Sequence, residues 1–251
     1  MKLFRSWLFV LFLYGSMGIL GIVWLPALLL PRSATMLGIR IWARMALWGM
    51  RVICGATTEI RGTEHLTKEP LLVASKHQST IDPLLPFLYL KDPCIVLKKE
   101  LLWYPAFGWY AMRANMIAID RKGSTKALKS MAEQARAAAA KGRSILIFPE
   151  GTRNPPGTPG DYKPGIALLY KEIGLDCLPV ALNTGVCWPP KGVMLETPAD
   201  VATHAREIYL QAGITHAMPP ANLSALGKVL GRFLEVEVCL MTGTPGTAPM
   251  I

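Results

Sequence analysis

The chain has 251 residues, of which 51% are hydrophobic, and a formal net charge of +10. This length allows one globular domain of roughly 200 residues after a membrane segment, and a membrane is needed to account for so high a hydrophobic share. The positive charge indicates a negatively charged partner, but no nucleic-acid module is recognisable. Anionic lipid, a phosphorylated substrate or an acidic carrier protein is therefore favoured over nucleic acid.

The amino terminus carries a long uncharged segment, residues 7–30. A helix over this segment would be roughly 36 Å long, enough to cross a hydrocarbon core of about 30 Å. A signal peptide is disfavoured, because neither a short apolar core nor a small-residue cleavage site is evident. Glycines and Pro26 weaken a straight helix, and basic residues flank both ends, so the orientation in the membrane stays open.

A second apolar segment, residues 36–53, is interrupted only by Arg40, Arg44 and Arg51 among charged residues. Their spacing places all three on one helical face, which is typical of an interfacial helix with a basic stripe. We therefore expect residues 1–55 to form a membrane-embedded two-helix segment, either a hairpin set into one leaflet or one span followed by a surface helix.

The stretch KHQSTIDP, residues 76–83, follows an apolar run at residues 71–74 that predicts a short buried strand. His77 would lie where this strand ends, and Asp82, at a helix start that Pro83 favours, would fold back to hydrogen-bond one ring nitrogen. This is the layout of a general base and the carboxylate that orients it. For the H-x-x-x-x-D spacing alone, a histidine satisfied by a local carboxylate is the commoner interpretation.

The stretch FPEGTR, residues 148–153, follows a second apolar run. Gly151 allows a tight turn and Thr152 offers a hydroxyl. Arg153 is suited to holding a phosphate, and Glu150 to holding polar hydroxyls. The alternative is a surface turn with a local ion pair.

Two further predicted strands end in basic residues, with Lys98 after residues 94–97 and Arg121 after residues 116–119. Each basic residue alone would usually be solvated. Four strand ends that each deliver a charged or titratable group are expected where a site is assembled at the edge of an open α/β sheet.

Together these blocks resemble the glycerophospholipid acyltransferases, and most closely the bacterial 1-acyl-sn-glycerol-3-phosphate acyltransferases. KHQSTIDP resembles the family's H-x-x-x-x-D block, IAIDR its second block, FPEGTR its third and CLPVALNTG, residues 177–185, its fourth. The resemblance covers roughly residues 71–195. It implies transfer of an acyl chain from an acyl carrier protein or coenzyme A thioester to the free hydroxyl of lysophosphatidate, and we expect no further cofactor. The expected location is the cytoplasmic face of the bacterial inner membrane.

The residues support this reaction by their own chemistry. His77 would deprotonate the acceptor hydroxyl, and Asp82 would set the histidine tautomer, so that the alkoxide attacks the thioester directly. Arg153 and Lys98 are the first choices for the acceptor phosphate, and Arg121 is the third. Acylation of another lyso-lipid or of glycerol-3-phosphate stays open, as does a non-catalytic membrane lipid-binding protein. A serine hydrolase is disfavoured because the G-x-S-x-G motif is missing.

The alternation of strands and helices predicts an α/β fold with a mixed sheet flanked by helices, in an acyltransferase domain over residues 56–195. Strands are predicted near residues 58–61, 71–74, 94–97, 116–119, 144–148 and 178–182. The clearest helix runs over residues 125–141, with Ser124 as N-cap and Gly142 as C-cap. The five cysteines are odd in number, without a C-x-x-C pair, so we expect reduced thiols and no metal site.

The last segment, residues 196–251, carries no family signature and few charges. Alternation over residues 234–240 is compatible with a strand. A divergent tail and a reading-frame change after Leu195 both account for the segment, and the second is preferred. We therefore expect residues 196–251 to be an atypical, poorly ordered tail.

Overall fold

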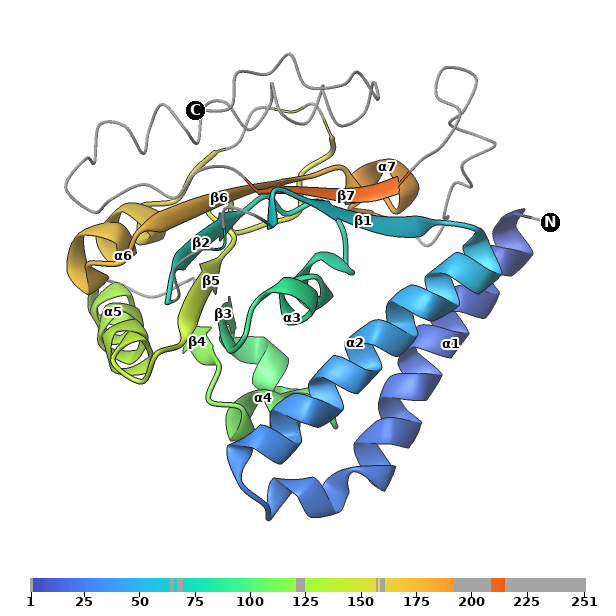
Figure 1. Cartoon of the computed structure of the whole chain (residues 1–251), viewed down its shortest axis with the longest axis horizontal. Coiled ribbons are helices and arrows are strands. Elements are labelled where there is room, and N and C mark those ends of the chain that lie inside the picture. The colour runs from blue at the N-terminus through green and yellow to red at the C-terminus, as the bar shows by residue number, and fades with distance from the viewer. Residues whose placement is uncertain are drawn as a thin grey trace.

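The computed structural model describes residues 2–63, 66, 70–120, 125–156, 158, 161–191 and 209–214. Two long helices, α1 (Lys2–Val23) and α2 (Arg32–Cys54), run antiparallel and project to one side of an α/β domain (Figure 1). A short 3-10 helix, η1 (Leu25–Leu28), joins them. The helix predicted over residues 7–30 therefore begins earlier and ends at Val23, because Pro26 is accommodated only in the first turn of the next helix.

Helix α1 is the one described segment long and apolar enough to cross a membrane, over Leu3–Val23. Helix α2 presents the predicted basic stripe only in part. Arg44 and Arg51 are exposed, whereas the Arg40 guanidinium donates to the backbone carbonyl of Leu90 at 3.1 Å. One of the three arginines thus ties the helix pair to the α/β domain.

The domain is built on a sheet that has seven strands within the described residues, in the order β1-β7-β6-β2-β5-β3-β4. The strands are β1 (Thr57–Arg61), β2 (Leu72–Ser75), β3 (Pro93–Lys98), β4 (Ile117–Ile119), β5 (Ser144–Ile147), β6 (Cys177–Leu182) and β7 (Tyr209–Ile214). Every neighbouring pair is parallel except β6 and β7, so the predicted mixed sheet is confirmed. All six strands predicted from the sequence are present.

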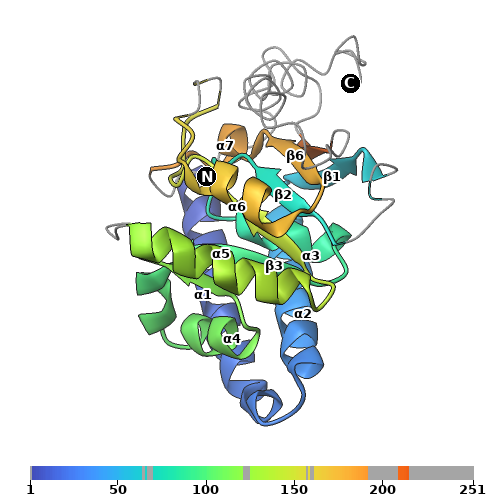
Figure 2. The same cartoon turned by 90° about the vertical axis from the view of Figure 1, so that its left-hand side faces the viewer.

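Helices cover both faces of this sheet (Figures 1 and 2). Helices α5 (Thr125–Ala139) and α6 (Gly165–Ile173) pack on one face, and α2 with the short helix α3 (Pro86–Tyr89) on the other. Leu71 and the successive residues of β2 just after it alternate between these two cores, with Leu71 and Val73 on the α2 side and Leu72 and Ala74 on the α5 side. Because both faces are covered, the strand reads as a continuous apolar run.

The remaining helices are short and lie around the ends of the strands. They are η3 (Asp82–Leu84), η4 (Lys99–Trp103), α4 (Phe107–Arg113) and α7 (Thr184–Cys187). Helix α5 ends close to the predicted limit, and Gly142 follows with a φ of +74°. Its predicted N-cap, Ser124, lies outside the described residues.

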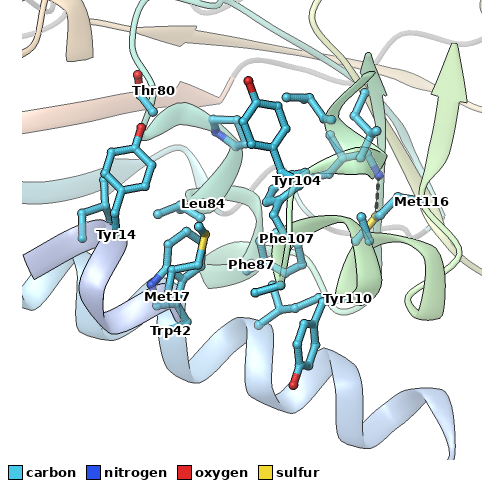
Figure 3. A pocket seen from close by; sticks show the side chains of 18 of the residues that line it. Tyr14, Met17, Trp42, Thr80, Leu84, Phe87, Tyr104, Phe107, Tyr110 and Met116 are labelled. Atoms are coloured by element: carbon cyan, nitrogen blue, oxygen red, sulfur yellow. Dashed lines mark hydrogen bonds between the residues drawn. The ribbon is translucent and has the colours of Figure 1, made fainter. Parts of the chain in front are cut away.

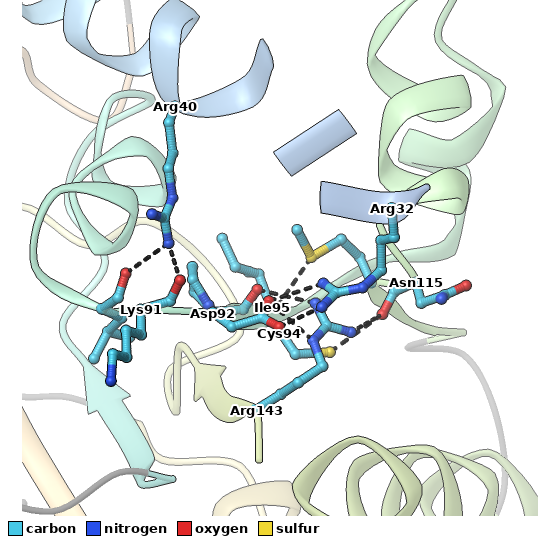
Figure 4. Close-up of polar contacts among 11 residues, drawn as sticks. Arg32, Arg40, Lys91, Asp92, Cys94, Ile95, Asn115 and Arg143 are labelled. Atoms are coloured by element: carbon cyan, nitrogen blue, oxygen red, sulfur yellow. Dashed lines mark hydrogen bonds and ion pairs between the residues drawn. The ribbon is translucent and has the colours of Figure 1, made fainter. Parts of the chain in front are cut away.

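An arginine clasp, formed by Arg32, Arg143 and Asp92, joins the start of α2 to the sheet (Figure 4). Arg32 donates to Asp92 Oδ1 at 2.8 Å, and Arg143 donates to the same oxygen at 3.2 Å. Arg143 also donates to the backbone carbonyls of Asn115 at 2.8 Å and Pro93 at 3.1 Å. The clasp therefore attaches the helix pair to the domain beside the start of β3.

Strand β7 falls within residues 196–251, the segment expected to form an atypical tail. It pairs with β1 on one side and β6 on the other. The strand suggested over residues 234–240 lies outside the described part of the chain. The limits given to the three regions of the chain, 1–55, 56–195 and 196–251, stay predictions.

Candidate active site

His77 and Asp82 lie together at the end of β2. The chain leaves the strand after Ser75, and η3 begins at Asp82, so the two side chains are brought to hydrogen-bonding distance. His77 Nδ1 lies 2.9 Å from Asp82 Oδ2, and the Asp82 side chain has no exposed surface. The same oxygen accepts the backbone N–H groups of Gln78 and Ser79, each at 2.7 Å.

Asp82 is also held from a distant part of the chain. The Thr184 hydroxyl, at the start of α7, donates to Asp82 Oδ1. Because donors surround both carboxylate oxygens, the ionised form of Asp82 is satisfied and takes the Nδ1–H of His77. The Nε2 atom of His77 is left as the position that can receive a proton.

The loop after β5 packs directly on the histidine. The ring of Phe148 stacks on the His77 ring with centroids 4.2 Å apart and an interplanar angle of 23°. The backbone N–H of Asn154 donates to the His77 carbonyl at 2.9 Å. His77 is thus held by Asp82 at one ring nitrogen, by Phe148 on one ring face and by Asn154 at its backbone.

Glu150 and Lys76 form a buried ion pair beside this histidine. Lys76 Nζ lies 2.8 Å from Glu150 Oε1, and the two side chains are 1% and 0% exposed. Burial raises the pKa of the Glu150 carboxyl, and the Lys76 ammonium and the His77 backbone N–H offset only part of this, so the pKa stays above its ordinary value. The sequence predicts that Glu150 faces the acceptor hydroxyls, but Glu150 does not line the cavity described below.

The other predicted binding residues lie on the open side of the site. Gly151 turns the loop with a φ of +67°, after which Thr152 and Arg153 are exposed and line the cavity. Arg153 donates to the Thr80 hydroxyl at 2.6 Å. Lys98, at the end of β3, lines the same cavity, and its Nζ lies 3.2 Å from Glu100 Oε1. Arg121 lies outside the described residues.

A cavity of about 950 Å³ extends from these residues between the helix pair and the α/β domain (Figure 3). Its mouth carries the polar side chains of His77, Thr80, Lys98, Thr152, Arg153 and Lys191. Its walls are mainly apolar and aromatic and include Tyr14, Met17, Trp42, Leu84, Phe87, Tyr104, Phe107, Tyr110 and Met116. A reactive polar mouth therefore opens into a chamber suited to an aliphatic chain.

Three contributors to this site were not predicted from the sequence: Thr184, Phe148 and Lys76. Phe148 and Lys76 lie inside the KHQSTIDP and FPEGTR blocks, and the signal for them was their adjacency to His77 and Glu150. Thr184 is remote in sequence from Asp82, so only the topology brings them together. Within the described ranges, no group of three or more His, Cys, Asp or Glu side chains could hold a metal ion.

Comparisons with known proteins find similar chains. A family model described as Acyltransferase matches residues 57–183. The 1-acyl-sn-glycerol-3-phosphate acyltransferase of Pseudomonas aeruginosa is 39% identical over 190 residues, which cover 75% of this chain and 74% of that protein. The enzyme of the same name from Cocos nucifera is 33% identical over 69% of this chain and 58% of its own length.

A solved structure shares the fold. The crystal structure of the 1-acyl-sn-glycerophosphate acyltransferase from Thermotoga maritima superposes with a TM-score of 0.72 and 20% sequence identity. The match covers 94% of this chain and 97% of that one, so it extends over the helix pair as well as the sheet.

Proposed function

We propose a reaction for this chain on the premise that it belongs to the acyltransferase family. The chain is a 1-acylglycerol-3-phosphate O-acyltransferase: it transfers an acyl chain to the free hydroxyl of lysophosphatidate and forms phosphatidate for phospholipid synthesis. The observation that carries the chemical proposal is the His77–Asp82 pair at the mouth of an apolar cavity.

The proposed mechanism needs one base and no covalent enzyme intermediate. His77 Nε2 takes the proton of the acceptor hydroxyl while Asp82 holds the Nδ1–H and stabilises the imidazolium. The acceptor oxygen then bonds to the thioester carbonyl carbon, the carbon–sulfur bond breaks, and the imidazolium returns its proton to the departing thiolate. Asp82 acts as a hydrogen-bond acceptor throughout, because its oxygens are held by fixed donors.

The acceptor phosphate is assigned to the basic mouth of the cavity. Arg153 supplies a forked guanidinium, Lys98 a point charge and Thr152 a hydroxyl donor, and all three line the cavity with His77. Gly151 is retained as the turn that presents them, since its φ is positive. Arg121 stays a proposed third basic contact.

The acyl chain fits the apolar walls of the cavity. Helix α1 supplies one wall with Tyr14 and Met17, and the opposite wall comes from α4 with Phe107 and Tyr110. Burying methylene groups there would contribute about 0.8 kcal/mol each. The donor is proposed to be an acyl carrier protein or coenzyme A thioester, with no other cofactor, and the positively charged surface suits either.

We assign the protein to the membrane, at the cytoplasmic face of the bacterial inner membrane, where soluble acyl thioesters and lipid acceptors meet. Every large hydrophobic side chain that is exposed in the described residues belongs to the helix pair with its connection or to the segment of η4 and α4. Such a concentrated patch on one part of the surface is typical of a lipid contact.

An acceptor panel tests the proposal. Purified protein in detergent is assayed with an acyl thioester and, in turn, lysophosphatidate, glycerol-3-phosphate and lyso-lipids with other headgroups, with His77→Ala as the matched control. We expect turnover with lysophosphatidate to exceed the others and to vanish in the variant. Preference for another acceptor would reassign the substrate, and lipid binding without turnover on any acceptor would favour the binding-protein alternative.

A further inference from the structure

The ion pair of Lys76 and Glu150 is unusual because both charged groups are almost completely withdrawn from water. Their side chains are 1% and 0% exposed, and Nζ and Oε1 are 2.8 Å apart. Charged side chains are seldom buried this deeply unless they are paired. Glu150 lies outside the cavity lining, so the pair is placed to act on the protein rather than on a bound acceptor.

This pair is connected to His77 through the backbone. Lys76 is the residue immediately before the histidine, and the His77 backbone N–H faces the Glu150 carboxylate. Asn154 links the other side, since its Nδ2 donates to Glu150 Oε2 at 3.2 Å and its backbone N–H donates to the His77 carbonyl at 2.9 Å. The backbone of His77 is thereby held between the carboxylate and the loop that carries it.

We propose that Lys76 and Glu150 are positioning residues that hold the backbone of His77 and balance each other's charge beside its imidazole. The inference rests on the proposed base role of His77. A lone carboxylate at this depth would favour the imidazolium, which cannot accept the acceptor's proton, and the Lys76 ammonium cancels that field.

Other charged groups contact the histidine or line the same cavity, and they do not duplicate the pair. Within the described residues these are Asp82 from η3, Lys98 from the end of β3, Arg153 from the loop after β5 and Lys191 beyond α7. Asp82 hydrogen-bonds the ring directly, and the three basic residues line the open cavity, where solvent and a bound phosphate screen them. Among these charged groups of the described residues, Lys76 and Glu150 are the two that are buried and lie next to the backbone of His77 instead of bonding its ring.

The test compares Lys76→Met, Glu150→Gln and the double variant by the dependence of kcat/KM on pH. Glu150→Gln leaves the Lys76 ammonium uncompensated, which disfavours the imidazolium, so the acid limb of the profile should move to lower pH. Lys76→Met leaves a buried carboxyl whose pKa is already raised, so its effect on the limb should be smaller. The double variant is neutral and similar in size, so its acid limb should return to the wild-type position. Its loss of kcat should also be smaller than the product of the two single losses.

Matched controls separate charge balance from general damage. Lys76→Arg keeps the charge, so its acid limb should stay at the wild-type pH. Arg136→Met breaks an exposed ion pair with Glu172 on the α5 side and should leave both kcat/KM and the acid limb unchanged. A rate loss in Glu150→Gln without any movement of the limb would overturn the proposal. So would a limb that stays displaced in the double variant.

A second readout needs no turnover and therefore separates this inference from the proposed function. In protein labelled at histidine, the imidazole signal that disappears in His77→Ala is identified by NMR and titrated in detergent. Its midpoint should fall in Glu150→Gln and return in the double variant even if the acceptor is misassigned. An unchanged midpoint in Glu150→Gln would refute the charge-balance role whatever the enzyme's substrate.

Discussion

The helix pair and the loops around His77 depart from the usual distribution of side chains in opposite ways. Helix α1 leaves Phe4 and Leu11 exposed by 72% and 70%, whereas the site buries Lys76, Asp82 and Glu150 at 1% exposure each. Exposed apolar surface is acceptable where lipid replaces water. Buried charge is acceptable where another charge or a set of donors replaces water.

The two regions should therefore respond differently to substitution. A lipid contact is non-directional and spread over many side chains, so each one contributes a small share. A buried polar network is directional, and removal of one member leaves its partner unsatisfied. Substitutions in the loops are expected to have large and specific effects, and substitutions on the helices small and graded ones.

The largest effect is expected from the base itself. His77→Ala removes the proton acceptor, and Asp82→Asn removes the negative charge that stabilises the imidazolium of His77. Each should lower kcat by roughly a hundred- to ten-thousandfold. Initial rates with lysophosphatidate and an acyl thioester measure this loss.

Membrane association is the internal control for that experiment. Both residues lie outside the helix pair, so the variants should sediment with membranes as the wild type does. A wild-type rate in the His77 variant would contradict the general-base mechanism. Loss of membrane binding in either variant would show that the site loops and the helix pair do not act independently.

The second effect concerns the rim that links the regions. Arg153→Met removes the forked guanidinium at the cavity mouth and should raise the KM for lysophosphatidate by about ten- to a hundredfold, as expected for loss of a charge-assisted hydrogen bond. The KM of Arg153→Lys should lie between those of the wild type and Arg153→Met, because a lysine keeps the charge without the forked guanidinium. Steady-state kinetics with each substrate varied in turn give the two Michaelis constants.

The exposed Lys129→Met on α5 is the charge-matched control for Arg153 and should leave both constants unchanged. An equal rise of the thioester constant in Arg153→Met would assign this arginine to the donor or to the fold instead of the acceptor phosphate.

The contrast between the regions also explains what the sequence could predict. Continuous apolar runs such as residues 71–74 and 144–147 identify buried strands without any knowledge of their neighbours, and all six predicted strands are present. The expected pairing of His77 with Asp82 is local, so its geometry could be anticipated from spacing.

Contacts between distant segments could not be anticipated in the same way. Thr184 reaches Asp82 only because β6 lies next to β2 in the sheet. Glu150 was predicted to bind substrate from a polar turn, but its side chain is buried and paired with Lys76. Arg40 looked like part of a surface stripe, but it donates to a carbonyl of the neighbouring domain. In each case the partner's position depends on tertiary packing.

The third effect is on stability, at the clasp that joins the two regions. Burial raises the pKa of Asp92, but hydrogen bonds and charges from Arg32 and Arg143 outweigh it and hold the pKa below its ordinary value. The ionised carboxylate therefore stabilises the fold above the ordinary carboxyl pKa, and this stability is lost as the pH falls through the lowered folded value. Asp92→Asn should cost about 1–2 kcal/mol at neutral pH.

Thermal denaturation in detergent between pH 3 and pH 8 measures this contribution. On acidification, the free energy of unfolding should fall less in the variant than in the wild type. Asp161→Asn, which removes an exposed partner of Lys163, should leave the curve unchanged. A variant with the full acidic decline would show that other carboxylates account for it and that the clasp contributes little.

The smallest effect is expected on the aromatic part of the lipid-facing surface. Trp103 and Trp109 are 83% and 45% exposed, and their segment packs against the end of the helix pair, where the Tyr110 hydroxyl donates to the Gly21 carbonyl at 2.9 Å. Tryptophan is favoured at the membrane–water interface. Serine at both positions should raise the KM for lysophosphatidate in vesicles by about fivefold, which corresponds to roughly 1 kcal/mol of apolar contact.

The comparison of two substrate forms makes that small effect interpretable. With lysophosphatidate dispersed in detergent, the double serine variant should match the wild type, because the cavity mouth is intact and no bilayer has to be approached. Phenylalanine at both positions retains most of the apolar area and should recover most of the vesicle activity. If the serine variant were equally impaired on dispersed substrate, these tryptophans would be part of the acceptor path or the fold. The lipid-facing surface would then be limited to the helix pair.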